Sequence, residues 1–151
     1  MFSKFFGKKD KPKLSPQELM ATSYNSLVSK LDIFVRNKME AKEIATHIYN
    51  DGISSYLEFY FNQGINKTID DINLDYLPDR TGQFISHIKQ QQKDLFSGKI
   101  DFDDLIIESI SLDFDIINQF IKESLCDIDD HEIKLGIILA VVNKIVNDWD
   151  L

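Results

Sequence analysis

The sequence predicts an all-α fold, a single-domain bundle of five or six helices with a short basic, phenylalanine-rich N-terminal tail. Only three prolines and six glycines occur in the 151 residues, which favours long helices over tight turns. Apolar residues recur at spacings of three and four, the period of an amphipathic helix. Hydrophobic residues make up 43% of the chain, which is enough for a core. We therefore expect a flexible tail over residues 1–14 and one helical domain over residues 15–151.

The first helix is predicted to begin at Ser15. Ser15 and Glu18 have the spacing of a capping box, in which each side chain binds the other residue's backbone N–H. Pro16 then takes the first helical position, where a missing N–H costs nothing. One apolar stripe follows, at spacings of four and three: Met20, Tyr24, Leu27, Leu31 and Phe34.

Two shorter helices are predicted next, over residues 40–49 and 53–62. The intervening Asn50-Asp51-Gly52 is typical of a helix stop or kink. Gly64 closes the second of these helices, whose aromatic cluster at 56–61 is more typical of helix packing than of a ligand cage. The polar run 66–77 is predicted to be a connector.

Three helices are predicted in the remaining half, over residues 78–96, 101–125 and 129–149. For two segments, a strand is the alternative to a helix. Residues 110–116 alternate between apolar and polar side chains, the period of a strand, and 135–142 are rich in β-branched residues. The long flanking segments without turn residues favour helix for both. In the last helix, the small residues Gly136 and Ala140 are expected to allow a close neighbour, which places this helix at the centre of the bundle.

Charge is distributed unevenly along the chain. Residues 1–13 carry five lysines and one aspartate, whereas residues 101–132 carry eleven carboxylates and one lysine, a net charge of −10. The whole chain has a net charge of −8, which repels nucleic acid and attracts basic partners. We therefore expect a basic protein partner and no direct binding of nucleic acid.

Four carboxylates of the predicted helix at 101–125 share one face with Ser111, because the five residues recur at spacings of three and four: Asp101, Asp104, Glu108 and Asp115. One interpretation is an ordinary solvated helix face. Another is a surface that recognises a basic partner or mimics nucleic-acid phosphates. The predicted partner-binding residues are Asp101, Asp104, Glu108, Asp115, Asp127, Asp129 and Asp130.

Motifs of catalysis and of metal binding are missing from the sequence. It contains no GxGxxG, GxxxxGK[ST], GxSxG or HExxH. Asp71, Asn73 and Asp75 match the first ligands of an EF-hand, but Gly82 stands where the loop needs a bidentate glutamate. Cys126 is the only cysteine, which fits a reducing compartment, and we expect it to be a small buried hydrophobic side chain. We expect no catalytic activity, cofactor or metal.

The N-terminal tail has three interpretations. It is a disordered segment that ends at the Ser15 cap, a weak membrane anchor at the inner face of the membrane, or a segment whose phenylalanines dock a partner. The anchor would place apolar rings and cationic groups together at the lipid surface: Phe2, Lys4, Phe5, Phe6, Lys8 and Lys9. The longest apolar stretch, residues 135–142, is too short to span a bilayer.

One resemblance concerns the heptapeptide YLEFYFN at residues 56–62. It resembles a short aromatic–asparagine motif in a family of acidic, all-helical bacterial proteins that includes a DNA mimic. The resemblance covers these seven residues, and Ser54 and Ser55 stand where that family has paired glycines. It implies a bacterial, helical, acidic protein and adds DNA mimicry to the possible functions.

These observations predict a cytoplasmic, non-enzymatic protein that neutralises or scaffolds a basic protein partner, as inhibitor or immunity-type proteins do. The alternative function is that of a peripheral membrane adaptor or secretion-type chaperone attached through residues 1–13. A DNA-mimic protein is the further alternative.

Overall fold

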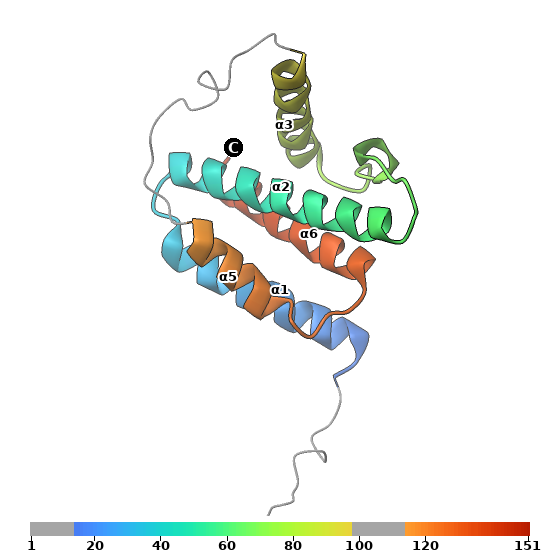
Figure 1. The fold of residues 1–151 in the computed structure, drawn as a ribbon. Coiled ribbons are helices and arrows are strands. Elements are labelled where there is room, and N and C mark those ends of the chain that lie inside the picture. The colour runs from blue at the N-terminus through green and yellow to red at the C-terminus, as the bar shows by residue number, and fades with distance from the viewer. Residues whose placement is uncertain (1–13, 98–113) are drawn as a thin grey trace, which may run out of the picture.

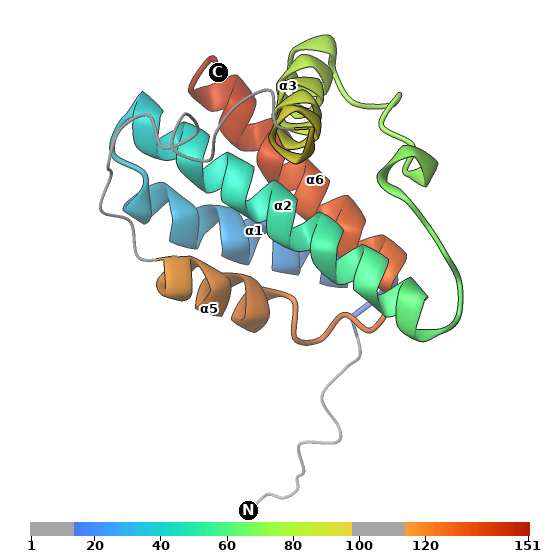
Figure 2. The ribbon, with the colours of Figure 1, turned by 45° about the horizontal axis from the view of Figure 1, so that its top comes forward.

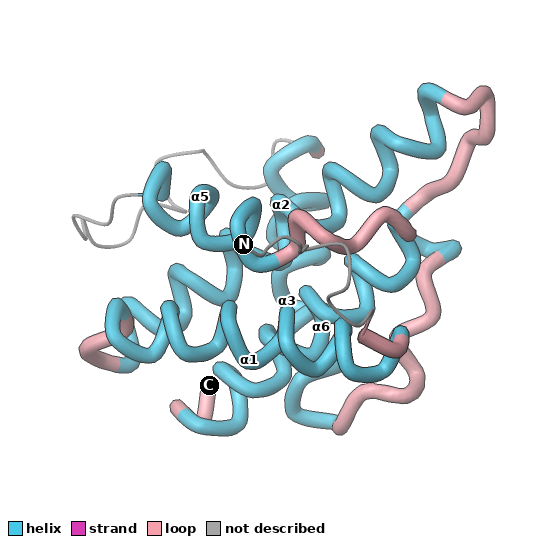
Figure 3. Tube along the Cα trace, turned by 90° about the horizontal axis from the view of Figure 1, so that it is seen from below, coloured by secondary structure: helices cyan, strands magenta, loops and turns pink. Residues whose placement is uncertain are grey.

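The computed structural model describes residues 14–97 and 114–151, and it confirms an all-α bundle (Figure 1). The described residues contain helices and loops and no strand (Figure 3). Their elements are α1 (Pro16–Phe34), α2 (Lys38–Asn62), the short 3-10 helix η2 (Ile69–Asp71), α3 (Asp79–Phe96), α5 (Phe114–Ser124) and α6 (His131–Asp148). Residues 101–113 of the predicted fifth helix lie outside the described residues.

Helix α6 is the centre of the bundle, as predicted. It packs against α1, α2 and α3. It runs antiparallel to α2, and α5 lies along α1 on the other side of the bundle (Figures 1 and 2). Eight residues of α6 are buried, among them Ile137, Ile138, Val141 and Val142. A helix that is apolar around most of its circumference is typical of a buried position. The strand alternative for residues 135–142 is therefore wrong.

The capping box at the start of α1 is formed as predicted. The backbone N–H of Glu18 donates to Ser15 Oγ at 3.1 Å, and the Ser15 N–H donates to Glu18 Oε1 at 2.9 Å. Leu27 and Leu31 of the predicted stripe are buried, whereas Met20 is exposed. The core-facing part of α1 is thus its central and C-terminal turns.

Helix α2 is continuous, which corrects the predicted break at Asn50-Asp51-Gly52. Glycine in a helix costs about 1 kcal/mol relative to alanine. Burial of Ile53 and Tyr56 beyond the glycine offsets this cost, because a large apolar side chain contributes roughly 1.5–3 kcal/mol when it leaves water. Packing on both sides of the triplet therefore outweighs its weak local preference for helix.

The close approach between helices occurs at Gly52, not at Gly136 as predicted. A Cβ atom at Gly52 would lie 2.6 Å from Ile138 Cγ2, whereas a Cβ atom at Gly136 would meet nothing within 4 Å. The small residue that lets α2 and α6 meet is thus on α2. The predicted end of α2 is confirmed, since the helix ends at Asn62 and Gly64 adopts a φ of 78°, a conformation that favours glycine.

Helix α5 carries the described part of the predicted acidic helix. Ile117, Ile121 and Leu125 are buried, and their spacing of four is that of the apolar face of an amphipathic helix. The α5 helix begins at Phe114, so the strand alternative is wrong for residues 114–116, and residues 110–113 lie outside the described range. A hydrogen bond, an ion pair and an edge-to-face ring contact connect α1 to α5: Ser26–Ser124, Lys30–Glu123 and Phe34–Phe120.

Candidate functional site

The loop between α5 and α6 concentrates negative charge at one end of the bundle. Residues 123–132 contain five carboxylates and no lysine or arginine, and all five side chains are exposed. We call this surface the acidic corner, and its residues are Glu123, Asp127, Asp129, Asp130 and Glu132.

The backbone of the acidic corner is anchored from both sides. Ile128 is 4% exposed, so its side chain belongs to the core. The Ile128 N–H donates to the carbonyl of Leu125 at 3.0 Å. Asp130 caps α6, and its Oδ1 accepts from the N–H of Glu132 at 2.8 Å. The three aspartates of the corner therefore lie on a loop whose backbone is fixed by contacts within the chain.

The five carboxylates differ in how far they are neutralised within the chain. Glu123 accepts from Gln119 at 3.0 Å and pairs with Lys30 at 3.2 Å, and these two contacts lower the pKa of its carboxyl. Asp127 and Asp129 make no hydrogen bond or ion pair with any other described residue. They are the two acidic groups of the corner that are most available to a cation.

Glu132 is held in a network that the sequence analysis did not predict. Its Oε2 accepts from the hydroxyl of Tyr56 at 2.7 Å and from the hydroxyl of Tyr60 at 2.5 Å. Lys67 lies 3.4 Å from the same oxygen and donates to the Tyr56 hydroxyl at 3.0 Å. Its ammonium also stands 4.2 Å from the centre of the Tyr60 ring, a cation–π distance.

These contacts explain the pKa shifts within the network. The hydrogen bonds from Tyr60 and Tyr56 stabilise the ionised carboxyl and hold the pKa of Glu132 below its usual value of 4.5. The hydrogen bond to Glu132 in turn raises the pKa of Tyr60 to about 12. These shifts favour the ionised carboxyl and the neutral hydroxyls, and the hydrogen bonds behind them join α2, the connector and α6.

The sequence indicates one part of this network, the two tyrosines. Tyr56 and Tyr60 are four residues apart, so they share a helix face. Their partner Glu132 is 76 residues away from Tyr56, and only the antiparallel packing of α2 and α6 brings the two together. Phe59 marks the same junction, since its ring stacks on His131 with 3.7 Å between the ring centres.

Of the predicted partner-binding residues, Asp127, Asp129 and Asp130 lie together in the acidic corner. Asp115 is exposed near the other end of α5, roughly 15 Å away at 1.5 Å per helical residue. That separation exceeds the screening length of about 8 Å at physiological salt, so Asp115 is not part of the same cluster. Asp101, Asp104 and Glu108 lie outside the described residues. So do the predicted membrane-contact residues Phe2, Lys4, Phe5, Phe6, Lys8 and Lys9.

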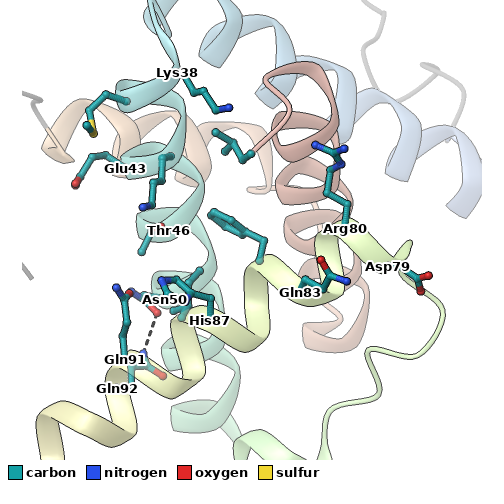
Figure 4. A pocket seen from close by; sticks show the side chains of 15 residues that line it. Lys38, Glu43, Thr46, Asn50, Asp79, Arg80, Gln83, His87, Gln91 and Gln92 are labelled. Atoms are coloured by element: carbon teal, nitrogen blue, oxygen red, sulfur yellow. Dashed lines mark hydrogen bonds between the residues drawn. The ribbon is translucent and has the colours of Figure 1, made fainter. Parts of the chain in front are cut away.

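A groove of about 1210 Å³ separates the N-terminal half of α2 from α3, and we call it the α2–α3 groove (Figure 4). One hydrogen bond crosses it, from Gln92 Nε2 to Asn50 Oδ1 at 2.9 Å (Figure 4). The charged groups on its walls are of both signs: Lys38, Lys42, Glu43, Asp79 and Arg80. The groove therefore favours no ligand of one particular charge.

A smaller cavity of about 330 Å³ lies between α2, α5 and α6, and we call it the three-helix cavity. Cys126 lines it and is exposed, which corrects the expectation that this cysteine is buried. The residue directly follows the last turn of α5, and its Sγ donates to the carbonyl of Glu123 at 3.2 Å. His131 lines the same cavity, so the fold brings together two residues whose spacing alone indicated little.

Among residues 14–97 and 114–151, no three His, Cys, Asp or Glu side chains are grouped so that they could hold a metal ion. Within that same part of the chain, no helix is both long and apolar enough to cross a membrane. Comparison with models of protein families, with curated proteins and with solved structures found no match to this chain.

Proposed function

We propose that this chain is a non-enzymatic interaction protein that binds a basic protein partner through the acidic corner. The observation that supports the proposal is the cluster of three exposed aspartates on an anchored loop, with an exposed glutamate on the helix at each end of it. An array of like charges on a fixed backbone steers an oppositely charged partner and loses little conformational freedom on binding. Neutralisation of a toxic or regulatory basic protein, in the manner of an inhibitor or immunity protein, fits this arrangement.

Asp127 and Asp129 are the residues on which the proposal depends most. A carboxylate that already has a partner in the same chain gains less from a second cation. Both aspartates lack such a described partner, whereas Glu123, Asp130 and Glu132 are engaged within the chain. We therefore expect the two aspartates to contribute more to binding than the other three carboxylates of the corner.

The test is a capture experiment from cells of the native host with the double variant Asp127→Asn/Asp129→Asn. The matched control is Asp70→Asn/Asp75→Asn, which makes the same change in net charge at two exposed aspartates of the connector. We expect a basic protein to be captured by the wild type and by the control, and to be lost with the corner variant. Its binding to the wild type should weaken as salt is raised, because salt screens exposed charges.

Two results would contradict the proposal. Equal capture by the corner variant would show that Asp127 and Asp129 do not bind the partner. Equal loss with the connector control would show that total charge, and not the acidic corner, governs capture. Both variants change exposed side chains without a described partner, so their unfolding free energies should stay within about 0.5 kcal/mol of the wild type.

The membrane function is retained as a second candidate because of one sequence observation. Three phenylalanines and five lysines occur within residues 1–13. Co-sedimentation with anionic liposomes tests it, and a chain without residues 1–13 that sediments as well as the full chain would exclude it.

A further inference from the structure

The three-helix cavity has an apolar floor. Five buried side chains line it. One is Tyr56 of α2, and the other four are aliphatic, two from the α5 side and two from α6: Ile121, Leu125, Leu135 and Ile138. Its volume of about 330 Å³ lies at the lower end of the range of roughly 300–1,000 Å³ for small-molecule sites. One molecule of liquid water, which has a single non-hydrogen atom, occupies roughly 30 Å³. At that volume per atom, the cavity has room for about eleven non-hydrogen atoms.

Lysines line this cavity within an otherwise acidic region. Residues 114–151 contain eight carboxylates but only three lysines and no arginine. Two of these lysines, Lys122 of α5 and Lys134 of α6, line the three-helix cavity. Neither makes an ion pair or hydrogen bond with a described residue, whereas the third, Lys144, pairs with Asp148 at 3.0 Å. Asp51 of α2 is the one carboxylate among the lining residues, so the charged side chains that line the cavity are two lysines and one aspartate.

We propose that the three-helix cavity binds a small amphipathic carboxylate, a straight alkyl chain of about eight carbons with one carboxyl group. The chain would cover the four apolar side chains of the floor, and the carboxylate would lie with Lys122 and Lys134. Eight carbons and two oxygens match the room for about eleven non-hydrogen atoms. An inorganic anion would leave the apolar floor exposed to water, and a neutral alcohol would leave both lysines without an anion. The carboxylate is the class that satisfies both features.

The single cysteine provides a direct readout at the site. Cys126 is exposed and lines the cavity, so a bound ligand should hinder its alkylation by neutral iodoacetamide. With saturating octanoate at constant ionic strength, we expect the alkylation rate of the full chain to fall about tenfold, since thiol reactivity depends on access. Octanol at equal concentration and chloride alone should protect much less.

Three variants distinguish the site from a general effect of octanoate. Lys122→Met/Lys134→Met should lose most of the protection, and Lys144→Met should keep it, because Lys144 does not line the cavity. Ser55→Trp places a large ring at an exposed lining position and should reduce binding of octanoate without removing a charge. This variant keeps the test informative if the double lysine variant does not fold.

The proposal is overturned if octanoate leaves the alkylation rate of the wild type unchanged. It is also overturned if octanol protects as well as octanoate, or if the lysine pair variant is protected as well as the wild type. The acidic corner is not changed in any of these variants, so the outcome is independent of whether the chain binds a basic protein.

Discussion

Helix α2 meets its two neighbours α6 and α3 in different ways. Against α6 the contact is close, since Gly52 leaves no room for even one additional methyl group beside Ile138. Against α3 the N-terminal half of α2 is separated by the α2–α3 groove, which the bond between Asn50 and Gln92 crosses (Figure 4). From this difference we expect the stability of the bundle to depend more on the α2–α6 contact than on the groove side.

The largest effect is expected from a substitution that forces α2 and α6 apart. Gly52→Val should lower the free energy of unfolding by about 3 kcal/mol, because overpacking of a dense contact typically costs 1–3 kcal/mol and valine is a weak helix former. The midpoint of urea denaturation measures this loss.

Gly136→Ala is the matched control for this contact. A Cβ atom there meets nothing within 4 Å, so alanine should stabilise the chain by up to about 1 kcal/mol through its higher helix propensity. If Gly52→Val proved as stable as the wild type, the close contact between α2 and α6 would not limit stability.

An intermediate effect is expected where α2 and α6 are joined by polar groups. Tyr56→Phe removes a hydroxyl that donates to the Glu132 carboxylate, and we expect a loss of about 1.5–3 kcal/mol, the usual net value of a hydrogen bond to a charged group. A loss above 3 kcal/mol would instead indicate a packing defect.

The same network predicts a dependence on pH. The folded pKa of Glu132 lies below its value in the unfolded chain, so its contribution is complete above 4.5 and is lost as the pH falls through the folded pKa. Glu132→Gln should therefore differ from the wild type more at pH 7 than at pH 3. Urea denaturation at both values measures this difference, and an equal difference at both would contradict the assignment.

The smallest effect is expected at the α2–α3 groove. Asn50→Ala removes the one described hydrogen bond that crosses it, and alanine is the better helix former, so the two changes offset each other. We expect the free energy of unfolding to change by less than about 1 kcal/mol. A larger loss would show that α3 depends on this bond for its position, and hydrogen exchange in α3 would then increase with it.

Local patterns in the sequence were sufficient to predict features that depend on residues within about one helix turn. The Ser15 cap, the end of α2 before Gly64 and the buried face of α5 all follow from short spacings that physical rules interpret directly. The break at Asn50-Asp51-Gly52 was wrong because the same local rules ignore the burial that α6 supplies. The position of Cys126 was wrong for a similar reason, since composition does not indicate which face of the α5 end meets solvent.

The candidate site was also predicted only in part from the sequence. The sequence located the negative charge and named Asp127, Asp129 and Asp130, because charge can be counted along the chain. It did not show that Asp115 lies apart from them, nor that Glu132 is engaged by Tyr56, Tyr60 and Lys67.

The sequence by itself determined the helical class, most helix ends and the sign of the charged surface, because these properties depend on residues close together in the chain. Tertiary structure alone decided that α2 is continuous, that Gly52 and not Gly136 is the contact point, and that Lys122 and Lys134 line one cavity with Cys126. The physical reason is that burial and contact free energies between distant segments are several times larger than local preferences of about 1 kcal/mol.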